Sequence, residues 1–283
     1  MSQKVLITGA NGQLGRELVE YFSNKNDFEV FGYGRHELDI TNQNQVEKLF
    51  SLVKPNIVIH SAAYTKVDLA ETDVDTAYLV NSVGTRNIAV AAENIDSKLV
   101  YISTDYVFDG TSGEPYNEFM STSPIGVYGK TKLAGEEFVS GFHNKYFIVR
   151  TSWVYGKHGN NFVKTMLKMA NEKDSLSVVH DQVGCPTYTF DLAACISELI
   201  KTSKYGVYHV SNSGMCSWYE FAKAIFEEAG LKVQLNACTS KEFPRPAPRP
   251  AYSVFDHMSL RLNGFKSMRH WKEAIAEFIE KNK

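Results

Sequence analysis

Short apolar runs alternate along the first half of the chain with longer stretches whose apolar positions have helical spacing. This alternation is typical of a parallel sheet whose strands are buried on both faces and connected by helices. It predicts an α/β fold, a doubly wound (Rossmann-like) parallel sheet. The expected strands are 5–7, 28–33, 55–60, 98–102 and 146–150, and the expected helices are 14–22, 45–53, 76–94 and 128–138.

The alternation becomes irregular after residue 150. Helices are predicted at 162–170, 191–200, 218–229 and 271–279, with a strand at 206–210. We therefore expect residues 1–150 to form a dinucleotide-binding domain. Residues 151–283 are expected to form mainly a smaller, mixed α/β substrate-binding region, from which some segments return to the first domain.

The charge balance argues against a nucleic-acid-binding protein, because 30 Lys and Arg residues face 32 Asp and Glu residues without a long charged run. No apolar run reaches the length of a membrane span. The four cysteines lack C-x-x-C spacing and the eight histidines lack H-x-x-x-H spacing, so a structural metal site is not indicated. With no signal peptide evident, we expect free thiols and a cytoplasmic location.

A glycine-rich turn lies between the first expected strand and helix. Gly9, Gly12 and Gly15 would permit a tight turn, close approach of a ligand and close packing of the helix on the strand. The N-terminus of the helix would then offer free N–H groups to a pyrophosphate. The alternative is a turn that serves packing alone. The predicted cofactor contacts here are Gly9, Asn11, Gly12, Gln13, Leu14 and Gly15.

Cofactor choice is expected to depend on Arg35, which follows the second strand. An acid near this point would bind the ribose 2′-OH of NAD, whereas an arginine suits the 2′-phosphate of NADP. Arg35 therefore favours NADP(H), with NAD(H) also open; the alternative is a solvated loop arginine. Asp39 could bond the adenine amino group, and small residues after strand 55–60 would admit the cofactor. The further predicted contacts are Asp39, Ile40, Ala62, Ala63 and Tyr64.

The candidate catalytic side chains are Thr104, Tyr128 and Lys132. Tyr128 and Lys132 are four residues apart and would share one helical face. This spacing alone is weak, since Tyr219 and Lys223 share it. The Tyr128 pair is distinguished by its helix, which follows a strand ending in Ser103-Thr104, where ligands of open α/β sheets bind.

With these residues placed, the whole chain resembles the extended short-chain dehydrogenase/reductases. Residues 8–15 match their T-G-x-x-G-x-x-G motif, and Thr104, Tyr128 and Lys132 match their Ser/Thr-Tyr-Lys triad. Within that group the chain resembles the dTDP-4-dehydrorhamnose reductases. The stretches that carry this resemblance are S-T-D-Y-V-F-D-G at 103–110, Y-G-K-T-K-L-A-G-E at 128–136, R-T-S-W-V-Y-G at 150–156 and D-Q-V-G-C-P-T at 181–187.

The resemblance implies reduction of the C4 ketone of dTDP-4-dehydro-L-rhamnose by NADPH or NADH, for bacterial surface polysaccharide. Some members are homodimers that use Mg²⁺, although no carboxylate cluster here compels a metal site. Tyr128 would protonate the substrate oxygen, and the Lys132 cation would lower the tyrosine pKa from about 10. Lys132 would also hold the nicotinamide ribose, and Thr104 would donate a hydrogen bond to the substrate oxygen.

The substrate is expected to lie between the triad and the C-terminal region. Trp153 could offer a flat face to the sugar or could be a core residue. Arg249 lies in a proline-rich, stiff segment at 243–250 and could meet the diphosphate, or it could pair with an internal acid. The predicted substrate contacts are Thr104, Asp105, Val107, Phe108, Tyr128, Trp153 and Arg249.

Three other functions are alternatives to this one. Another nucleotide-sugar 4-ketoreductase would have the same motifs. A 4,6-dehydratase needs an Asp-Glu pair after the threonine, and here Thr104 is followed by Asp105 and Tyr106. A regulatory NADP-binding subunit, such as the β subunit of methionine adenosyltransferase, resembles this group without doing its chemistry, but the triad is complete in this chain.

Overall fold

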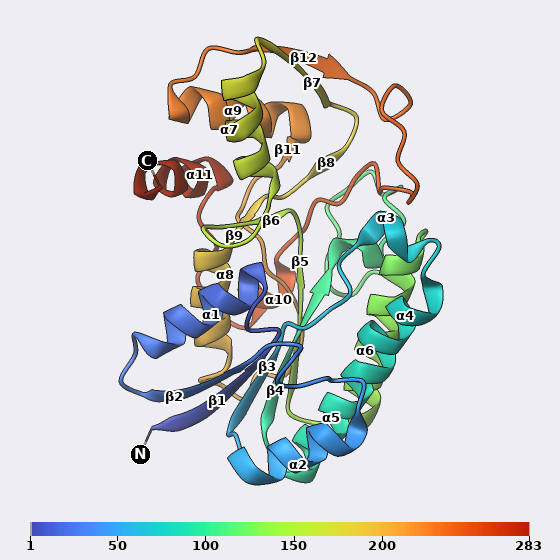
Figure 1. Cartoon of the computed structure of the whole chain (residues 1–283), viewed down its shortest axis with the longest axis vertical. Helices are drawn as coiled ribbons and strands as arrows, with labels where there is room; N and C mark the ends of the chain where they lie inside the picture. Colours follow the sequence, from blue (N-terminus) through green and yellow to red (C-terminus); the bar gives the residue numbers. More distant parts are fainter. Residues whose placement is uncertain (1, 283) are drawn as a thin grey trace.

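The computed structural model, which describes residues 2–282, is built on a parallel sheet (Figure 1). The strand order is β10-β5-β4-β3-β1-β2 in a six-stranded sheet, and all its pairings are parallel. The order reverses between β1 and β3, where ligands of doubly wound sheets bind. The predicted fold is confirmed. The strands are β1 Gln3–Thr8, β2 Phe28–Tyr33, β3 Ile57–His60, β4 Lys98–Thr104, β5 Tyr146–Thr151 and β10 Gly206–His209.

Helices cover both faces of this sheet. Side chains alternate along β1, so Val5 and Ile7 pack in the core under α1 and α8, while Leu6 packs in the opposite core under α2, α5 and α6. Figure 1 shows these two helical layers on either side of the strands. The covering helices are α1 Gln13–Ser23, α8 Thr189–Leu199, α2 Gln43–Val53, α5 Thr85–Asn94 and α6 Val127–Phe142.

The helix predicted at 76–94 is interrupted. The structure has α4 Val74–Tyr78, a π-helical turn at Leu79–Gly84 and then α5, preceded by the short α3 Val67–Ala70. The π turn buries Asn81, whose Oδ1 accepts from the backbone N–H of Tyr64 at 2.7 Å and whose amide donates to the Tyr64 carbonyl at 3.1 Å. Periodicity does not predict such a turn, because residues 74–94 have a continuous helical spacing of apolar positions.

The second part of the chain forms a smaller unit above the sheet, with its own core of aromatic and aliphatic residues. Sequence patterns missed its strands, which are short or half-exposed. Its helices are α7 Phe162–Glu172, α9 Trp218–Ala229 and α11 Trp271–Lys281. Its strands pair as β7 Ser175–Val179 with β12 Gln234–Cys238, β6 Val154–Tyr155 with β9 Thr187–Tyr188, and β8 Val183–Gly184 with β11 Cys216–Ser217.

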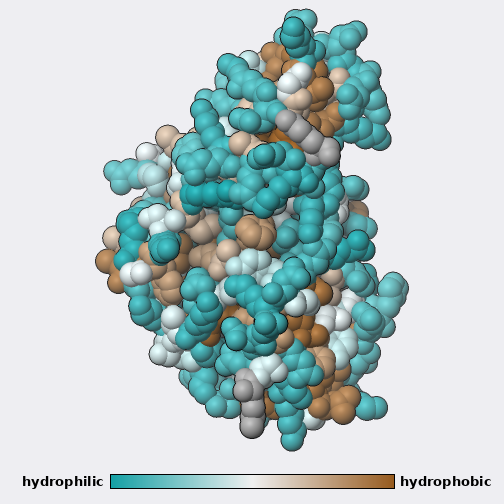
Figure 2. Space-filling model, turned by 90° about the vertical axis from the view of Figure 1, so that its left-hand side faces the viewer, coloured by the Kyte–Doolittle hydropathy of each residue, from teal (hydrophilic) through white to brown (hydrophobic). Residues whose placement is uncertain are grey.

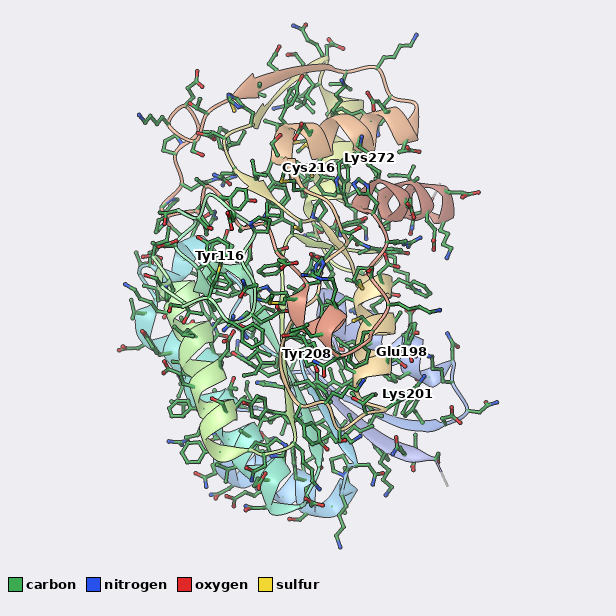
Figure 3. All side chains as sticks on the ribbon, turned by 180° about the vertical axis from the view of Figure 1, so that it is seen from behind. Tyr116, Glu198, Lys201, Tyr208, Cys216 and Lys272 are labelled. Atoms are coloured by element: carbon green, nitrogen blue, oxygen red, sulfur yellow. The ribbon has the colours of Figure 1, made fainter. Side chains whose placement is uncertain are left out.

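Segments from the second half also lie against the sheet. β10 extends it beside β5, α8 packs on α1, and the short α10 Met258–Leu262 lies beside β10. Figure 3 places Tyr208 on β10, with Cys216 and Lys272 in the smaller unit above. Figure 2 shows the side of this elongated molecule, with hydrophobic residues in separate patches. No helix within residues 2–282 is long and apolar enough to cross a membrane.

Candidate functional site

The glycine turn has the geometry of a phosphate-binding loop. Gly9 has φ +68°, and a Cβ there would lie 2.7 Å from the Ala62 backbone. A Cβ on Gly15 would lie 2.1 Å from the Gly9 carbonyl oxygen, so α1 can approach the turn only with glycine there. Gly12 is the N-cap of α1 and has no side chain to cap it, which leaves the first N–H groups of the helix for a ligand. These residues fit a dinucleotide.

The side chains of Asn11 and Gln13, in and beside this turn, contact different parts of the chain. The Asn11 amide lies over Gly34, where a Cβ would be 2.0 Å from its nitrogen. The Gln13 amide donates to the Val154 carbonyl at 3.0 Å and its oxygen accepts from Asn161 at 2.9 Å. The Gln13 side chain therefore joins α1 to the second half of the chain, so any contact from Gln13 to a cofactor would come from its backbone N–H. Leu14 packs against the sheet core.

Arg35 lies exposed just beyond β2 and forms no ion pair within residues 2–282. Its charge is therefore available to a ligand. The Asp39 carboxylate accepts from the Thr41 backbone N–H at 3.0 Å and from the Thr41 hydroxyl at 2.8 Å. The Ile40 side chain is buried in the core, so any contact from it to a cofactor would come from its backbone.

The loop after β3 lies directly over the glycine turn. Ala62 contacts Gly9, Ala63 follows it, and the backbone of Tyr64 is held by both ends of the Asn81 amide. The Tyr64 hydroxyl donates to Asp73 at 3.0 Å. The sequence does not indicate Asn81, because this residue lies seventeen residues along the chain from Tyr64, inside an apparently regular helix.

The three predicted catalytic residues meet beside the ends of β4 and α6. Thr104 ends β4. Tyr128 and Lys132 lie on successive turns of α6, and the Thr104 hydroxyl is near enough to the Tyr128 phenol to influence its pKa. A Cβ on Gly129 would lie 2.1 Å from the Tyr106 carbonyl oxygen, so this glycine lets α6 pack against the loop after β4. Lys132 is buried, with its ammonium 4.0 Å from the centre of the Tyr101 ring.

The electrostatics of the triad differ from the expectation. Burial and the Asp105 charge raise the pKa of Tyr128 to about 12 rather than lowering it, and the neighbouring Thr104 hydroxyl opposes this rise. Burial lowers the pKa of Lys132 to about 7. The predicted lowering of the tyrosine pKa by Lys132 is therefore wrong for this structure, because desolvation of the phenolate dominates.

Asp105 and Thr104 form a buried pair at the start of the short helix at Asp105–Val107. The Thr104 hydroxyl donates to the Asp105 carboxylate at 3.0 Å, and burial raises the pKa of Asp105 to about 6. Val107 and Phe108 were predicted to cover the sugar, but both side chains are fully buried in a small core with Tyr116. We assign them a packing role, because the Phe108 ring stacks on Tyr116 at 4.2 Å between centroids.

Trp153 packs against the core of the smaller unit, and its contact with the sugar stays a prediction. Its ring stacks on Trp218 with centroids 3.6 Å apart, and it remains partly exposed. A Cβ on Gly184 would lie 2.7 Å from the Trp153 ring, so the absence of a side chain there admits the indole. Trp153 also has φ +47°, a conformation that a bulky residue rarely adopts.

Arg249 is paired with an internal acid. Its Nη2 lies 2.9 Å from the Asp68 carboxylate on α3, and its guanidinium lies 5.7 Å from the centre of the Tyr106 ring. Its Nη1 is buried and has no hydrogen-bond partner within residues 2–282. The Tyr106 ring in turn meets Tyr128 edge to face at 5.5 Å. Tyr106 is thus a neighbour of the triad that the sequence did not single out.

No group of three His, Cys, Asp or Glu residues within residues 2–282 could hold a metal ion. The structure gives no support to the Mg²⁺ that the resemblance left open.

Comparison with known proteins agrees with this geometry. The family described as "RmlD substrate binding domain" matches residues 3–283. The spore coat polysaccharide biosynthesis protein SpsK of Bacillus subtilis is 46% identical over 98% of this chain and 97% of its own length. The dTDP-4-dehydrorhamnose reductase of Aggregatibacter actinomycetemcomitans is 44% identical over 96% of this chain and 97% of its own length.

A solved structure shows the same likeness. The dTDP-4-dehydrorhamnose reductase of Bacillus anthracis, in complex with NADP, is 52% identical and superposes with a TM-score of 0.97 over 99% of this chain and 100% of that one. The resemblance predicted from the motifs is confirmed, as is the expectation of an oxidoreductase. The chain belongs to the dTDP-4-dehydrorhamnose reductase family.

Proposed function

We propose that this chain reduces the C4 ketone of dTDP-4-dehydro-L-rhamnose to dTDP-L-rhamnose with NADPH. The observation that carries the proposal is the neighbouring Thr104 and Tyr128 hydroxyls, with Lys132 one turn further along α6, at the edge of the sheet where the glycine turn fits a dinucleotide. Family membership supplies the dTDP-sugar substrate. The likeness to SpsK supports a role in surface polysaccharide synthesis.

The residues at this site divide the reaction between them. NADPH, when bound, supplies the hydride that the carbonyl carbon accepts. The Tyr128 hydroxyl is protonated at neutral pH and would pass its proton to the developing alkoxide. Thr104 would turn its hydroxyl from Asp105 to the substrate oxygen. Lys132 would bind the nicotinamide ribose and face the tyrosinate that remains after proton transfer.

The second candidate substrate is a related dTDP-linked 4-keto sugar. The dTDP-4-keto-6-deoxy-D-glucose reductase of Streptomyces niveus is 38% identical over 98% of this chain, which is close to several relatives that act on the rhamnose precursor. A coupled assay decides between the two. dTDP-glucose is incubated with a 4,6-dehydratase, with or without a 3,5-epimerase, and the loss of NADPH absorbance is followed. Turnover that requires the epimerase supports the proposal, and equal turnover without it favours the second sugar.

The state of the cysteine thiols supports the predicted cytoplasmic location. All four cysteines are free, and burial raises the pKa of the Cys185 thiol to about 11. Unreactive, unpaired thiols suit a reducing compartment, so we propose that the enzyme works in the cytoplasm.

Arg35→Ala is expected to raise the KM for NADPH about tenfold or more and to leave the KM for NADH nearly unchanged. An exposed, unpaired guanidinium beyond β2 can make a charge-assisted bond to the 2′-phosphate, typically worth about 1.5–3 kcal/mol. Steady-state kinetics with each cofactor measure the effect. His36→Ala, at the next exposed position, serves as the control. An equal rise for both cofactors would show that Arg35 is structural.

Arg249→Ala is expected to raise the KM for the dTDP-sugar about tenfold, because the unpartnered Nη1 can donate to the diphosphate. Asp68→Asn is the matched control, since it removes the same ion pair and keeps the arginine. It should leave the KM unchanged or lower it. If both variants lose thermal stability equally and neither changes the KM, Arg249 serves only the ion pair.

A further inference from the structure

A buried ion pair lies behind the triad, outside the residues assigned to the reaction. The Arg150 side chain bonds the Glu136 carboxylate twice, through Nη2 at 2.7 Å and Nε at 3.0 Å. The Ser103 hydroxyl donates to the same carboxylate. All three residues are at most 5% exposed. A buried pair of this kind adds little stability compared with apolar packing. Stability alone therefore does not explain why the pair lies here.

The pair is attached to the triad from two sides. Glu136 follows Lys132 by one turn on the face of α6 that carries Tyr128, with successive spacings of four residues. Ser103 immediately precedes Thr104 on β4, and it is the register partner of Arg150 on β5. Glu136 therefore joins α6 to the ends of both strands, which fixes how the helix lies against Thr104.

The groups that face Lys132 leave Glu136 as its counter-charge. From β3, His60 is neutral because burial lowers its pKa to about 3; from β4, burial keeps Tyr101 in its phenol form by raising its pKa. On α6 itself, Tyr128 is also protonated at neutral pH. The Glu136 charge favours the ammonium of Lys132 against the cost of burial. Within residues 2–282 the ammonium forms no direct ion pair, so this attraction acts through space.

Arg150, the partner of Glu136, is itself held by a residue of β10 and by an aromatic ring. The Arg150 Nη1 lies 3.4 Å from the ring of His209, whose pKa is held well below its ordinary value by burial and by the arginine. The Phe108 ring packs 5.3 Å from the guanidinium carbon. Because these contacts hold Arg150, its bonds to Glu136 also hold the carboxylate in place.

We propose that Glu136 is a positioning residue for Lys132, an inference that rests on the proposed reductase function. Its carboxylate, clamped by Ser103 and Arg150, fixes α6 against β4 and β5 and supplies the negative charge that the Lys132 ammonium faces. Without that charge Lys132 loses its proton more readily, and both of its tasks require the charged form.

The test is the titration of Lys132 in Glu136→Gln, a variant that keeps the size of the side chain. Chains labelled with ¹³C at lysine Cε are titrated by NMR, and the Lys132 signal is identified by its loss in Lys132→Met. We expect the midpoint of Lys132 to fall by at least about half a pH unit. The alkaline limb of the kcat profile should move to lower pH with it. Glu136→Asp keeps the charge one methylene further away and should give a smaller fall in the same direction.

Glu17→Gln is the matched control. Glu17 is also a buried carboxylate, bonded to the Thr189 hydroxyl at 2.9 Å, but it lies on α1 and away from α6. It should lower thermal stability without moving the Lys132 midpoint. A Glu136→Gln chain that loses stability with an unmoved Lys132 midpoint overturns the proposal. If the unaltered chain fails to oxidise NADPH with the dTDP-sugar, the proposed function fails, and the NMR titration still decides the role of Glu136.

Discussion

Tyr128→Phe is expected to lower kcat for NADPH-dependent reduction by at least about 10²-fold, the lower end for loss of a general acid. In the unaltered chain, the Tyr128 pKa of about 12 keeps the phenol protonated at neutral pH, which is the form that reduction requires. The Tyr128 hydroxyl lies near Thr104, beside which the ketone oxygen would bind. Phenylalanine keeps the ring and its edge-to-face contact with Tyr106, so cofactor affinity should change little.

The matched control for this variant is Tyr219→Phe. Tyr219 and Lys223 repeat the Y-x-x-x-K spacing on α9, in the smaller unit and away from the glycine turn. This control should leave kcat unchanged. Stopped-flow or steady-state loss of NADPH absorbance gives kcat, and fluorescence titration gives the Kd of the cofactor. Near-normal turnover in Tyr128→Phe would remove the tyrosine from the acid role and direct attention to a water or to Asp105.

Local patterns in the sequence predicted the parts of this site that depend on backbone geometry. A glycine at position 15 is recognisable because no other residue lets α1 approach the Gly9 carbonyl. Tyr128 and Lys132 were found because their spacing places them on one helical face and their helix follows β4. The strands of the sheet were found because burial on both faces leaves continuous apolar runs.

Features that depend on contacts between distant segments were not predictable. Arg249 pairs with Asp68, which is 181 residues earlier in the chain, and periodicity cannot choose that partner among the other acids. The burial of Val107 and Phe108 depends on residues near 255 and 185, which close over the loop after β4. The pKa of Tyr128 depends on desolvation, which is a property of the packed structure.

The second large effect is expected for Lys132→Met, which should damage both kcat and cofactor affinity. The lysine is assigned to the nicotinamide ribose and to the charge beside Tyr128, whereas methionine fills a similar volume without charge. In the unaltered chain, cofactor affinity should weaken as the pH rises through about 7, where Lys132 loses its proton. Calorimetric titration of the cofactor across that range should show this dependence disappearing in the variant.

The same variant should gain stability, and the sign follows from the pKa. The folded value of about 7 lies below the ordinary 10.5, so the folded chain binds fewer protons between these values and its unfolding free energy rises with pH there. Below about pH 7 the buried ammonium costs roughly 4–5 kcal/mol. Replacing it removes that cost and forfeits about 2 kcal/mol of attraction to the Tyr101 ring.

Lys132→Met should therefore raise the Tm at about pH 6 by several degrees, and the gain should shrink toward about pH 10. Thermal unfolding of both chains at these two pH values measures it, with Lys223→Met, an exposed lysine in the second Y-x-x-x-K pair, as the control that should show neither change. A variant that is inactive and also less stable at about pH 6 would mean that Lys132 is a packing residue. Loss of activity together with a gain in stability would identify a charge that the fold retains at a cost, because the reaction needs it.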